Sequence, residues 1–298
     1  MQVFDPLRTE DAFEVERPRE QTAPFVFNSP HSGARYPRAF LEASRLDASR
    51  IRLSEDAFVD RLFAGAVANG APLLKAHFPR AFLDVNREPY ELDPKMFSGR
   101  LPSYANIRSM RVAGGLGTIA RVVSEQDEIY PGPIPVEEAM RRIETYYKPY
   151  HATLRRLIAT TQQQFGHAVL IDCHSMPSAA RSLEIRGRTD IVLGDRFGTS
   201  CSAVLMEASY AILDDLGFSV SINKPYAGGF ITEHYGRPTR NVHALQIEIN
   251  RGIYMDERSF EPLPGFSEVA VALGEFVRRI VAQPLGLDDG GETPVAAE

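Results

Sequence analysis

Cysteine, long apolar runs and basic tracts are all scarce in this chain of 298 residues. The two cysteines are too few for a disulfide framework and lie in segments predicted to be buried, which indicates reduced thiols and a cytoplasmic protein. No apolar run approaches the roughly 20 residues that span a bilayer, and the acidic N-terminus lacks the pattern of a secretory signal. A net charge of -6 without a basic tract argues against a nucleic-acid partner, the lack of a long apolar run argues against a membrane, and a small solute is the expected partner.

Short apolar runs alternate with longer helix-like segments. This order predicts one catalytic α/β domain over residues 1–284, with a mixed, mainly parallel central sheet and helices on both faces. The acidic end, 285–298, has no periodicity and is predicted to be a disordered tail. The predicted strands are 25–28, 72–75, 81–85, 168–172, 190–193, 219–222 and 244–249. The predicted helices are 55–68, 136–165 with a kink or break at Pro149, 200–215 and 266–283.

Four of the predicted strands end in polar side chains. Because ligands of an open α/β sheet bind beyond the carboxyl ends of its strands, these side chains are expected to meet at one edge. Each alone has an ordinary explanation, such as a hydrogen-bonded loop histidine, but their joint occurrence indicates a site. They are His31 after the first strand, Asp84, Asn86 and Arg87 at the end of the third, His174 after the fourth, and Glu248, Asn250 and Arg251 at the end of the last.

Two imidazoles and a carboxylate, with one position open for water, are the ligands of a catalytic zinc site. A second carboxylate could take a proton from that water, and an arginine could stabilise an oxyanion or clamp a substrate carboxylate. This set predicts amide hydrolysis. Asp172 and His174 are two residues apart on one strand, so both are expected to face the site, with Asp172 orienting the histidine and Cys173 packed on the other face.

Six blocks of sequence, in order, carry these polar residues. They are NSPHSG at 28–33, FLDVNREPYELDP at 82–94, LIDCHSMP at 170–177, DIVLGDRFGTSC at 190–201, NKPYAGGFITEHYGRP at 223–238 and HALQIEINRGIYMDE at 243–257. Together they resemble the N-formylglutamate amidohydrolase family. The resemblance implies a zinc enzyme that releases formate and glutamate in one branch of histidine degradation, with a fold similar to that of zinc carboxypeptidases and aspartoacylase.

The resemblance also implies roles for single residues. His31 and His174 would be the zinc histidines. Glu248 is similar to the glutamate that serves as general base. The pair Asn86 and Arg87 resembles a segment that grips a substrate carboxylate in the carboxypeptidases. These roles together imply a zinc site at the edge of the sheet that both histidines share.

The carboxylate ligand has to come from elsewhere in the chain. Carboxypeptidases place a zinc-binding glutamate three residues after the first histidine, and here that position is Ala34. Asp56 is the candidate, because at the start of the predicted helix it could point back toward His31. Glu55 and Asp60 are weaker candidates. The alternative for Asp56 is an acid favoured by a helix dipole, without any metal.

A substrate with two carboxylates calls for two cationic groups. Arg87 is one by the resemblance, and Arg196, just past the strand 190–193, is favoured as the other. Arg80 is assigned to the reaction itself, as an oxyanion stabiliser. The other competitors are Arg181 and Arg237. His234, in a glycine-rich segment that could close over the substrate, is predicted to donate a hydrogen bond to it.

Other functions stay open at this point. The run DCHSM resembles the Asp-x-His-x-Asp manganese motif of arginase-type enzymes, but Met176 stands in place of the second aspartate. A hydrolase of another N-acyl amino acid fits the same motifs, because a family fixes chemistry better than substrate. A metal-binding protein without turnover is the non-enzyme alternative. A serine hydrolase is disfavoured, since no Gly-x-Ser-x-Gly elbow is present.

Overall fold

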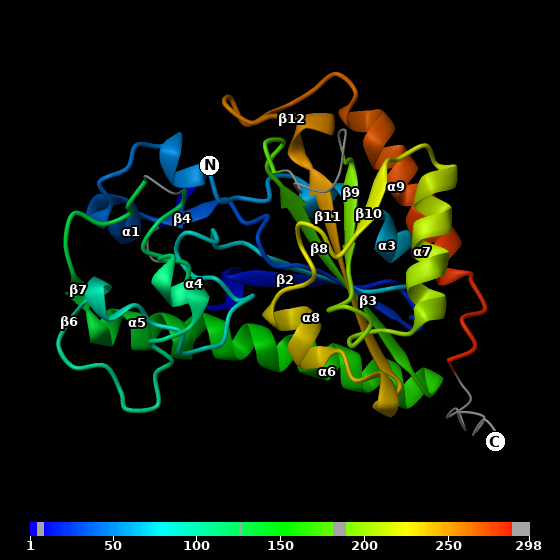
Figure 1. The fold of residues 1–298 in the computed structure, drawn as a ribbon, viewed down its shortest axis with the longest axis horizontal. Coiled ribbons are helices and arrows are strands. Elements are labelled where there is room, and N and C mark those ends of the chain that lie inside the picture. The colour runs from blue at the N-terminus through cyan, green and yellow to red at the C-terminus, as the bar shows by residue number, and fades with distance from the viewer. Residues whose placement is uncertain (5–8, 125–126, 181–188, 288–298) are drawn as a thin grey trace.

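The computed structural model of the protein describes residues 1–4, 9–124, 127–180 and 189–287. At its centre lies a seven-stranded sheet in the order β10-β9-β11-β8-β3-β5-β2 (Figure 1). Its strands are β2 (Phe13–Glu16), β3 (Phe25–Ser29), β5 (Leu73–Ala76), β8 (Ala168–Met176), β9 (Ile191–Gly194), β10 (Val220–Ile222) and β11 (Val242–Asn250). Three small pairs lie outside it: β1 (Gln2–Phe4) with β4 (Arg35–Pro37), β6 (Phe97–Ser98) with β7 (Ile134–Pro135), and β12 (Met255–Asp256) with β13 (Glu261–Pro262).

The middle of the main sheet is parallel. Strands β11, β8, β3 and β5 pair in parallel, whereas β9 runs antiparallel to β11, and β2 antiparallel to β5. The two central strands β8 and β11 are buried along their whole length, as strands covered on both faces are. The predicted class, a mixed and mainly parallel α/β sheet, is confirmed.

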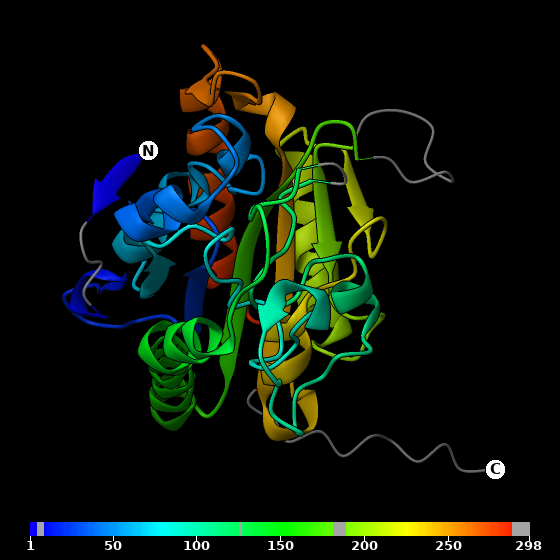
Figure 2. The ribbon, with the colours of Figure 1, turned by 90° about the vertical axis from the view of Figure 1, so that its left-hand side faces the viewer.

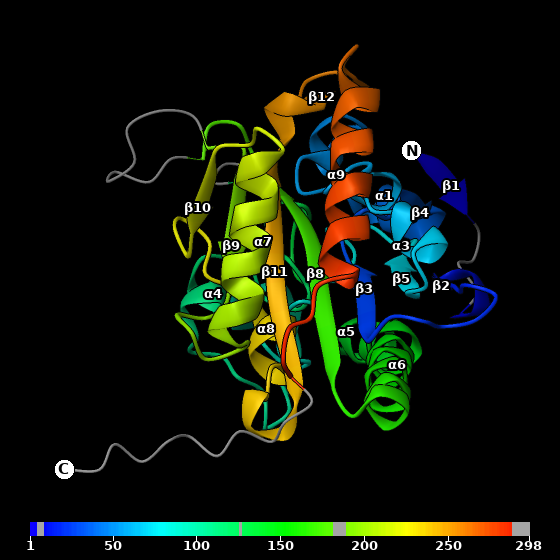
Figure 3. The same ribbon diagram turned by 90° about the vertical axis from the view of Figure 1, so that its right-hand side faces the viewer.

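Helices cover both faces of this sheet. Neighbouring residues of β8 point to opposite faces, so Leu170 joins the core beneath α6 and Ile171 joins the core beneath α7 and α9. Figure 3 shows α7 and α9 in front of the strands. The helices are α1 (Arg38–Ala43), α2 (Val59–Leu62), α3 (Gly65–Ala68), α4 (Met110–Ala113), α5 (Val136–Arg142), α6 (Lys148–Phe165), α7 (Ala203–Asp215), α8 (Phe230–Tyr235) and α9 (Phe266–Val281). Of the helices in the described residues, none is long and apolar enough to cross a membrane.

The predicted strand at 81–85 is wrong. The segment turns instead: Phe82 N donates to Pro79 O, and Asp84 N donates to Thr118 O. Its four apolar residues are buried in the core on the α6 face, Asp84 faces the site, and within the described chain the segment joins no sheet. The apolar residues therefore predicted the burial of this segment correctly, but not its secondary structure.

The predicted helix at 55–68 is also wrong as a single element, because the structure has α2 and α3 there. Phe58 adopts a left-handed φ of 68°, so a regular helix begins only at Val59, and Asp56 lies in the turn before it. The break predicted at Pro149 takes the form of one π-helical turn, Ile143–Tyr147, between α5 and α6. Pro149 itself occupies the first turn of α6, where a missing N–H is tolerated.

The C-terminal segment after α9 returns to the core. Leu285 and Leu287 are buried among the residues that α7 and α9 cover. Of the predicted tail, 285–298, the part from 288 onward lies outside the described residues.

Candidate active site

One face of three neighbouring strands carries the polar side chains of the site. The register of β3 on β8 pairs Asn28 with Asp172, and that of β11 on β8 pairs His174 with Glu248. Asp172 and His174 are both part of β8, which continues past its predicted end at 172. Cys173 lies in the opposite core, as expected from the alternation of a strand.

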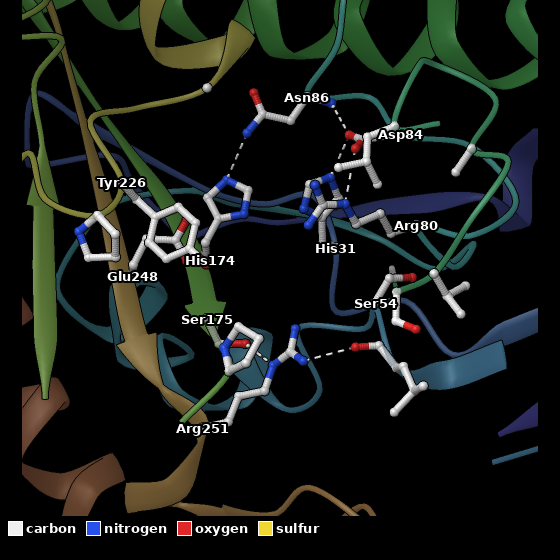
Figure 4. Close-up of a pocket in the computed structure, with 18 of the residues that line it drawn as sticks. His31, Ser54, Arg80, Asp84, Asn86, His174, Ser175, Tyr226, Glu248 and Arg251 are labelled. Carbon is white, nitrogen blue, oxygen red and sulfur yellow. Dashed lines mark hydrogen bonds and ion pairs between the residues drawn. The ribbon is translucent and has the colours of Figure 1, made fainter. Parts of the chain in front are cut away.

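His31, Asp56 and His174 come together, although they lie on a loop, a turn and a strand. One ligand atom of each lies within 4.8 Å of the others, and all three residues are buried. Asp56 Oδ2 is 3.5 Å from His31 Nδ1 and 3.1 Å from His174 Nδ1. Figure 4 shows the two imidazoles side by side in the pocket. These atoms form a possible metal-binding cluster.

A cation fits this cluster for a second reason. His31 Nδ1 is buried and has no hydrogen-bond partner among the described residues. A buried polar atom without a partner costs free energy, and such atoms in native proteins often mark a missing ion or water. Two imidazole nitrogens and a carboxylate oxygen are ligands that zinc accepts.

The outer nitrogen of each imidazole faces a carboxylate of its own. His31 Nε2 lies 2.8 Å from Asp84 Oδ1, and His174 Nε2 lies 2.9 Å from Asp172 Oδ2. A proton on Nε2, donated to the carboxylate, leaves the lone pair of Nδ1 directed at the cluster. Asp172 therefore lies where its predicted role requires. Asp84 does the same for His31, a role that was not predicted from its place in the sequence.

Both carboxylates are themselves held in place. Asp172 Oδ1 accepts from Asn28 Nδ2 at 2.7 Å, and Asn28 Oδ1 accepts from the hydroxyl of Tyr150 on α6 at 2.5 Å. Asp84 Oδ2 accepts from Arg80 Nε at 3.0 Å. Burial would raise the pKa of Asp84, but the charges of Arg87 and Arg80 hold it well below its usual value. Asp84, behind His31, is thus held as an anion. Asp172, behind His174, is held in place by its hydrogen bond from Asn28.

Arg251 fixes the orientation of Asp56, a role that was not predicted for this arginine. Its Nη2 donates to Asp56 Oδ1 at 2.9 Å, while Ser175 Oγ donates to the same oxygen at 3.2 Å. Arg251 Nη1 also donates to the carbonyl of Leu53 at 3.0 Å. Only Oδ2 of Asp56 is then left to face the histidines, so the carboxylate can offer one oxygen to an ion. The polar end of β11 was the signal that could have suggested Arg251.

Glu248 lies beside this cluster, one strand away from His174 (Figure 4). Burial raises the pKa of Glu248 to about 7; His174 opposes this shift, and the charge of Asp56 adds to it. Gln246 Nε2 donates to Glu248 Oε1 at 2.8 Å and holds the side chain in place. A carboxyl group with a pKa near neutrality is suited to both accepting and returning a proton.

The cluster opens into a cavity of about 930 Å³. Arg80, Asn86, Arg87 and Glu248 all line it. Asn86 lies 3.2 Å from His174 Nε2 through its Nδ2, and its Oδ1 accepts from Ile231 N of α8 at 2.7 Å. These predicted substrate-binding and catalytic residues are therefore brought together around one space.

Arg87 is anchored before any substrate arrives. Its Nε donates to Leu116 O at 2.9 Å and its Nη1 to Asn86 O at 2.7 Å. Burial lowers the pKa of Arg87 to about 10. A guanidinium held by carbonyl groups keeps its charge and a fixed direction toward the cavity.

The remaining predicted residues lie at the rim. Arg196 lines the main cavity and a second, adjoining one of about 460 Å³, whereas His234 and Arg237 line only the second. The imidazole of His234 stacks on Phe230 with 4.9 Å between ring centroids. Arg237 Nη1 donates to two backbone carbonyls of its own segment. Arg181 lies outside the described residues.

Metal affinity should fall as the pH decreases. Burial would lower the pKa of His174, but Asp172 and Asp56 raise it well above the usual value, so Nδ1 must release a proton before it binds a cation. We expect the dissociation constant for zinc to rise about tenfold per pH unit between pH 8 and pH 6 for each displaced proton. Competition with a chelator measures it, and Asp172→Asn should flatten the dependence. An affinity independent of pH would contradict this.

This cluster, with a carboxyl group of near-neutral pKa beside it, is suited to activating water for hydrolysis. Comparison with known proteins identifies the family to which the chain belongs. Residues 23–255 match the family described as N-formylglutamate amidohydrolase, and the chain belongs to this family.

The relatives agree with this assignment. An N-formylglutamate deformylase of Pseudomonas aeruginosa is 30% identical over 263 residues, which are 87% of this chain and 91% of that protein. Another, of Pseudomonas putida, is 31% identical over 237 residues, or 78% of this chain and 82% of that protein. The crystal structure of the N-formylglutamate amidohydrolase from Ralstonia eutropha JMP134 superposes with a TM-score of 0.85 at 34% identity, covering 91% of this chain and 97% of that one.

Proposed function

We propose that the protein hydrolyses N-formyl-L-glutamate to formate and L-glutamate, as a step of histidine degradation, with zinc held by His31, Asp56 and His174. The observation that carries the proposal is the buried cluster of these three side chains beside Glu248. The names of the relatives support the substrate. The same cavity also holds the arginines that a dicarboxylate requires.

A zinc ion bound by these residues would supply a Lewis acid that lowers the pKa of a water molecule to about 7. Glu248 takes one proton from the attacking water as its oxygen bonds to the formyl carbon. The same group then gives this proton to the glutamate nitrogen as the C–N bond breaks. Arg80, oriented by Asp84, stabilises the negative charge that develops on the formyl oxygen.

The rest of the cavity would orient the substrate. Asn86 lies beside His174, and Arg87 follows it and lines the same cavity, so this pair suits the α-carboxylate next to the scissile bond. Arg196 lies further out and suits the side-chain carboxylate. Asp172 and Asp84 keep both imidazoles in the tautomer that exposes Nδ1.

Metal analysis combined with a formate assay tests the proposal. The purified protein should contain about one zinc per chain and release formate from formylglutamate. Chelation should abolish the release, and added zinc should restore it. Full zinc occupancy without turnover would instead favour a metal-binding protein.

A hydrolase of another N-acyl amino acid is the second candidate, because the cavity of about 930 Å³ is larger than a formyl amino acid requires. The rates on formylglutamate, formylaspartate and acetylglutamate separate the two. A higher kcat/KM for acetylglutamate than for formylglutamate would show that the enzyme prefers a larger acyl group than formyl.

A further inference from the structure

The second cavity adjoins the site and is rich in arginine. Figure 2 shows the teal segment around α4 in front of the strands β8 and β11. The two cavities share the residues Asn86, Arg87, Arg111, Arg196, Gly228 and Gly229. A molecule whose amide lies at the histidines can therefore extend past these residues, and three of them are cationic.

Arg196 is presented to both cavities by an unusual turn. Arg196, Phe197 and Gly198 all have left-handed φ angles, of 56°, 58° and 81°. Two non-glycine residues in this region are costly, and such conformations persist where the surroundings fix them, often at binding sites. Asp195 fixes this turn by accepting from Gly198 N at 2.9 Å, and Arg196 N donates to Ala227 O at 2.7 Å.

A carboxylate already occupies the partner position of Arg196. Glu233, on α8, places Oε2 2.6 Å from Arg196 Nη2, and Arg196 Nη1 donates to Gly228 O at 3.3 Å. The two side chains are 35% and 63% exposed for Arg196 and Glu233 respectively. Ion pairs this exposed are weak, so another carboxylate can replace Glu233.

We infer that Arg196 determines specificity for an acidic side chain on the substrate, and that Glu233 holds Arg196 in place until the substrate carboxylate displaces it. This inference rests on the proposed function, because it assigns the second carboxylate of the same substrate. Arg87 is already anchored to two backbone carbonyls, whereas the guanidinium of Arg196 pairs with the exposed carboxylate of Glu233, which makes Arg196 the candidate for the outer carboxylate. The ion pair with Glu233 shows that a carboxylate can reach Arg196 there.

The test compares formylglutamate with formylglutamine, which lacks the side-chain charge. Glu233→Gln should lower KM for formylglutamate about two- to fivefold, the strength of an exposed ion pair, and leave KM for formylglutamine within experimental error. Arg196→Asn, which tolerates the left-handed backbone, should raise KM for formylglutamate about tenfold or more. In the double variant, the effect of Glu233→Gln should disappear.

Glu88→Gln is the matched control, because Glu88 is an exposed acid that lines the second cavity and hydrogen-bonds to Asn106 at a distance of 3.1 Å. It removes the same charge without releasing Arg196. An equal fall in KM in this variant would show a general field effect and overturn the inference. So would an unchanged preference for formylglutamate over formylglutamine in Arg196→Asn.

Equilibrium binding separates this inference from the proposed function. Calorimetry of the zinc-loaded protein with L-glutamate and L-glutamine requires no turnover. A preference for L-glutamate that Arg196→Asn removes would support the subsite even if formylglutamate is not hydrolysed. Equal binding of both amino acids by the unaltered protein would reject the subsite, whatever the formate assay shows.

Discussion

Replacing Glu248 by Gln should lower turnover by about a hundredfold or more while zinc content stays unchanged, the usual scale for loss of an acid–base group. The amide has nearly the same shape as the carboxylate, and its oxygen can still accept from Gln246, so the local packing should persist. It cannot, however, accept a proton from water. Stopped assays of formate release, with metal analysis of the same samples, measure both quantities.

The matched control for this variant is Glu257→Gln. Glu257 lines the same cavity but is engaged by the backbone of Ser178 at 3.0 Å. Its replacement should leave turnover within a fewfold of the original value. Near-normal turnover after replacement of Glu248 would eliminate it as the base, and loss of zinc in that variant would indicate that it is a metal ligand.

The decrease of kcat/KM on the acidic side of its pH profile should report the protonation of Glu248. Its carboxylate is the form that accepts the proton, so kcat/KM should decrease as the pH falls through the pKa of this group. Burial places that pKa at about 7 before a cation binds. A bound zinc ion should lower this pKa below 7, because positive charge favours the carboxylate.

The central residues could be predicted because each follows from local sequence. His31, His174 and Glu248 lie on or just after apolar strands, and the topology of a parallel sheet brings such positions to one edge. The pairing of β8 with β11 then sets His174 opposite Glu248. Strand alternation also sufficed for Asp172, two residues before His174.

The contacts that hold these groups in place could not be predicted in this way. Arg251 meets Asp56 across 195 positions of sequence, and Asp84 meets His31 across 53. The sequence placed Arg251 and Asp84 among the polar residues at the strand ends, but it did not show which side chain each of them would contact. Burial of 81–85 misled the prediction for the same reason, since an apolar run does not reveal whether tertiary packing or strand pairing buries it.

Replacing Asp56 by Asn should remove the metal and the activity together. Burial would raise the pKa of Asp56, but its hydrogen bond with His174, the nearby imidazole of His31 and the charge of Arg251 hold it well below its usual value, so the side chain is an anion at neutral pH. A neutral amide is a poorer ligand, and its NH₂ group would face the two Nδ1 atoms. We expect zinc affinity to fall by more than the roughly hundredfold that the loss of an outer partner costs.

Asp60→Asn is the matched control, because Asp60 lies four positions further on, at α2, and was itself a candidate ligand. It does not line the cavity, so zinc content and formate release should stay near their original values. Thermal unfolding of both variants in chelator shows whether the fold is retained. The Asp56 variant should unfold earlier than the unaltered protein, since Arg251 is left buried without its anion. Zinc retained by the Asp56 variant and lost by the Asp60 variant would transfer the ligand assignment to Asp60.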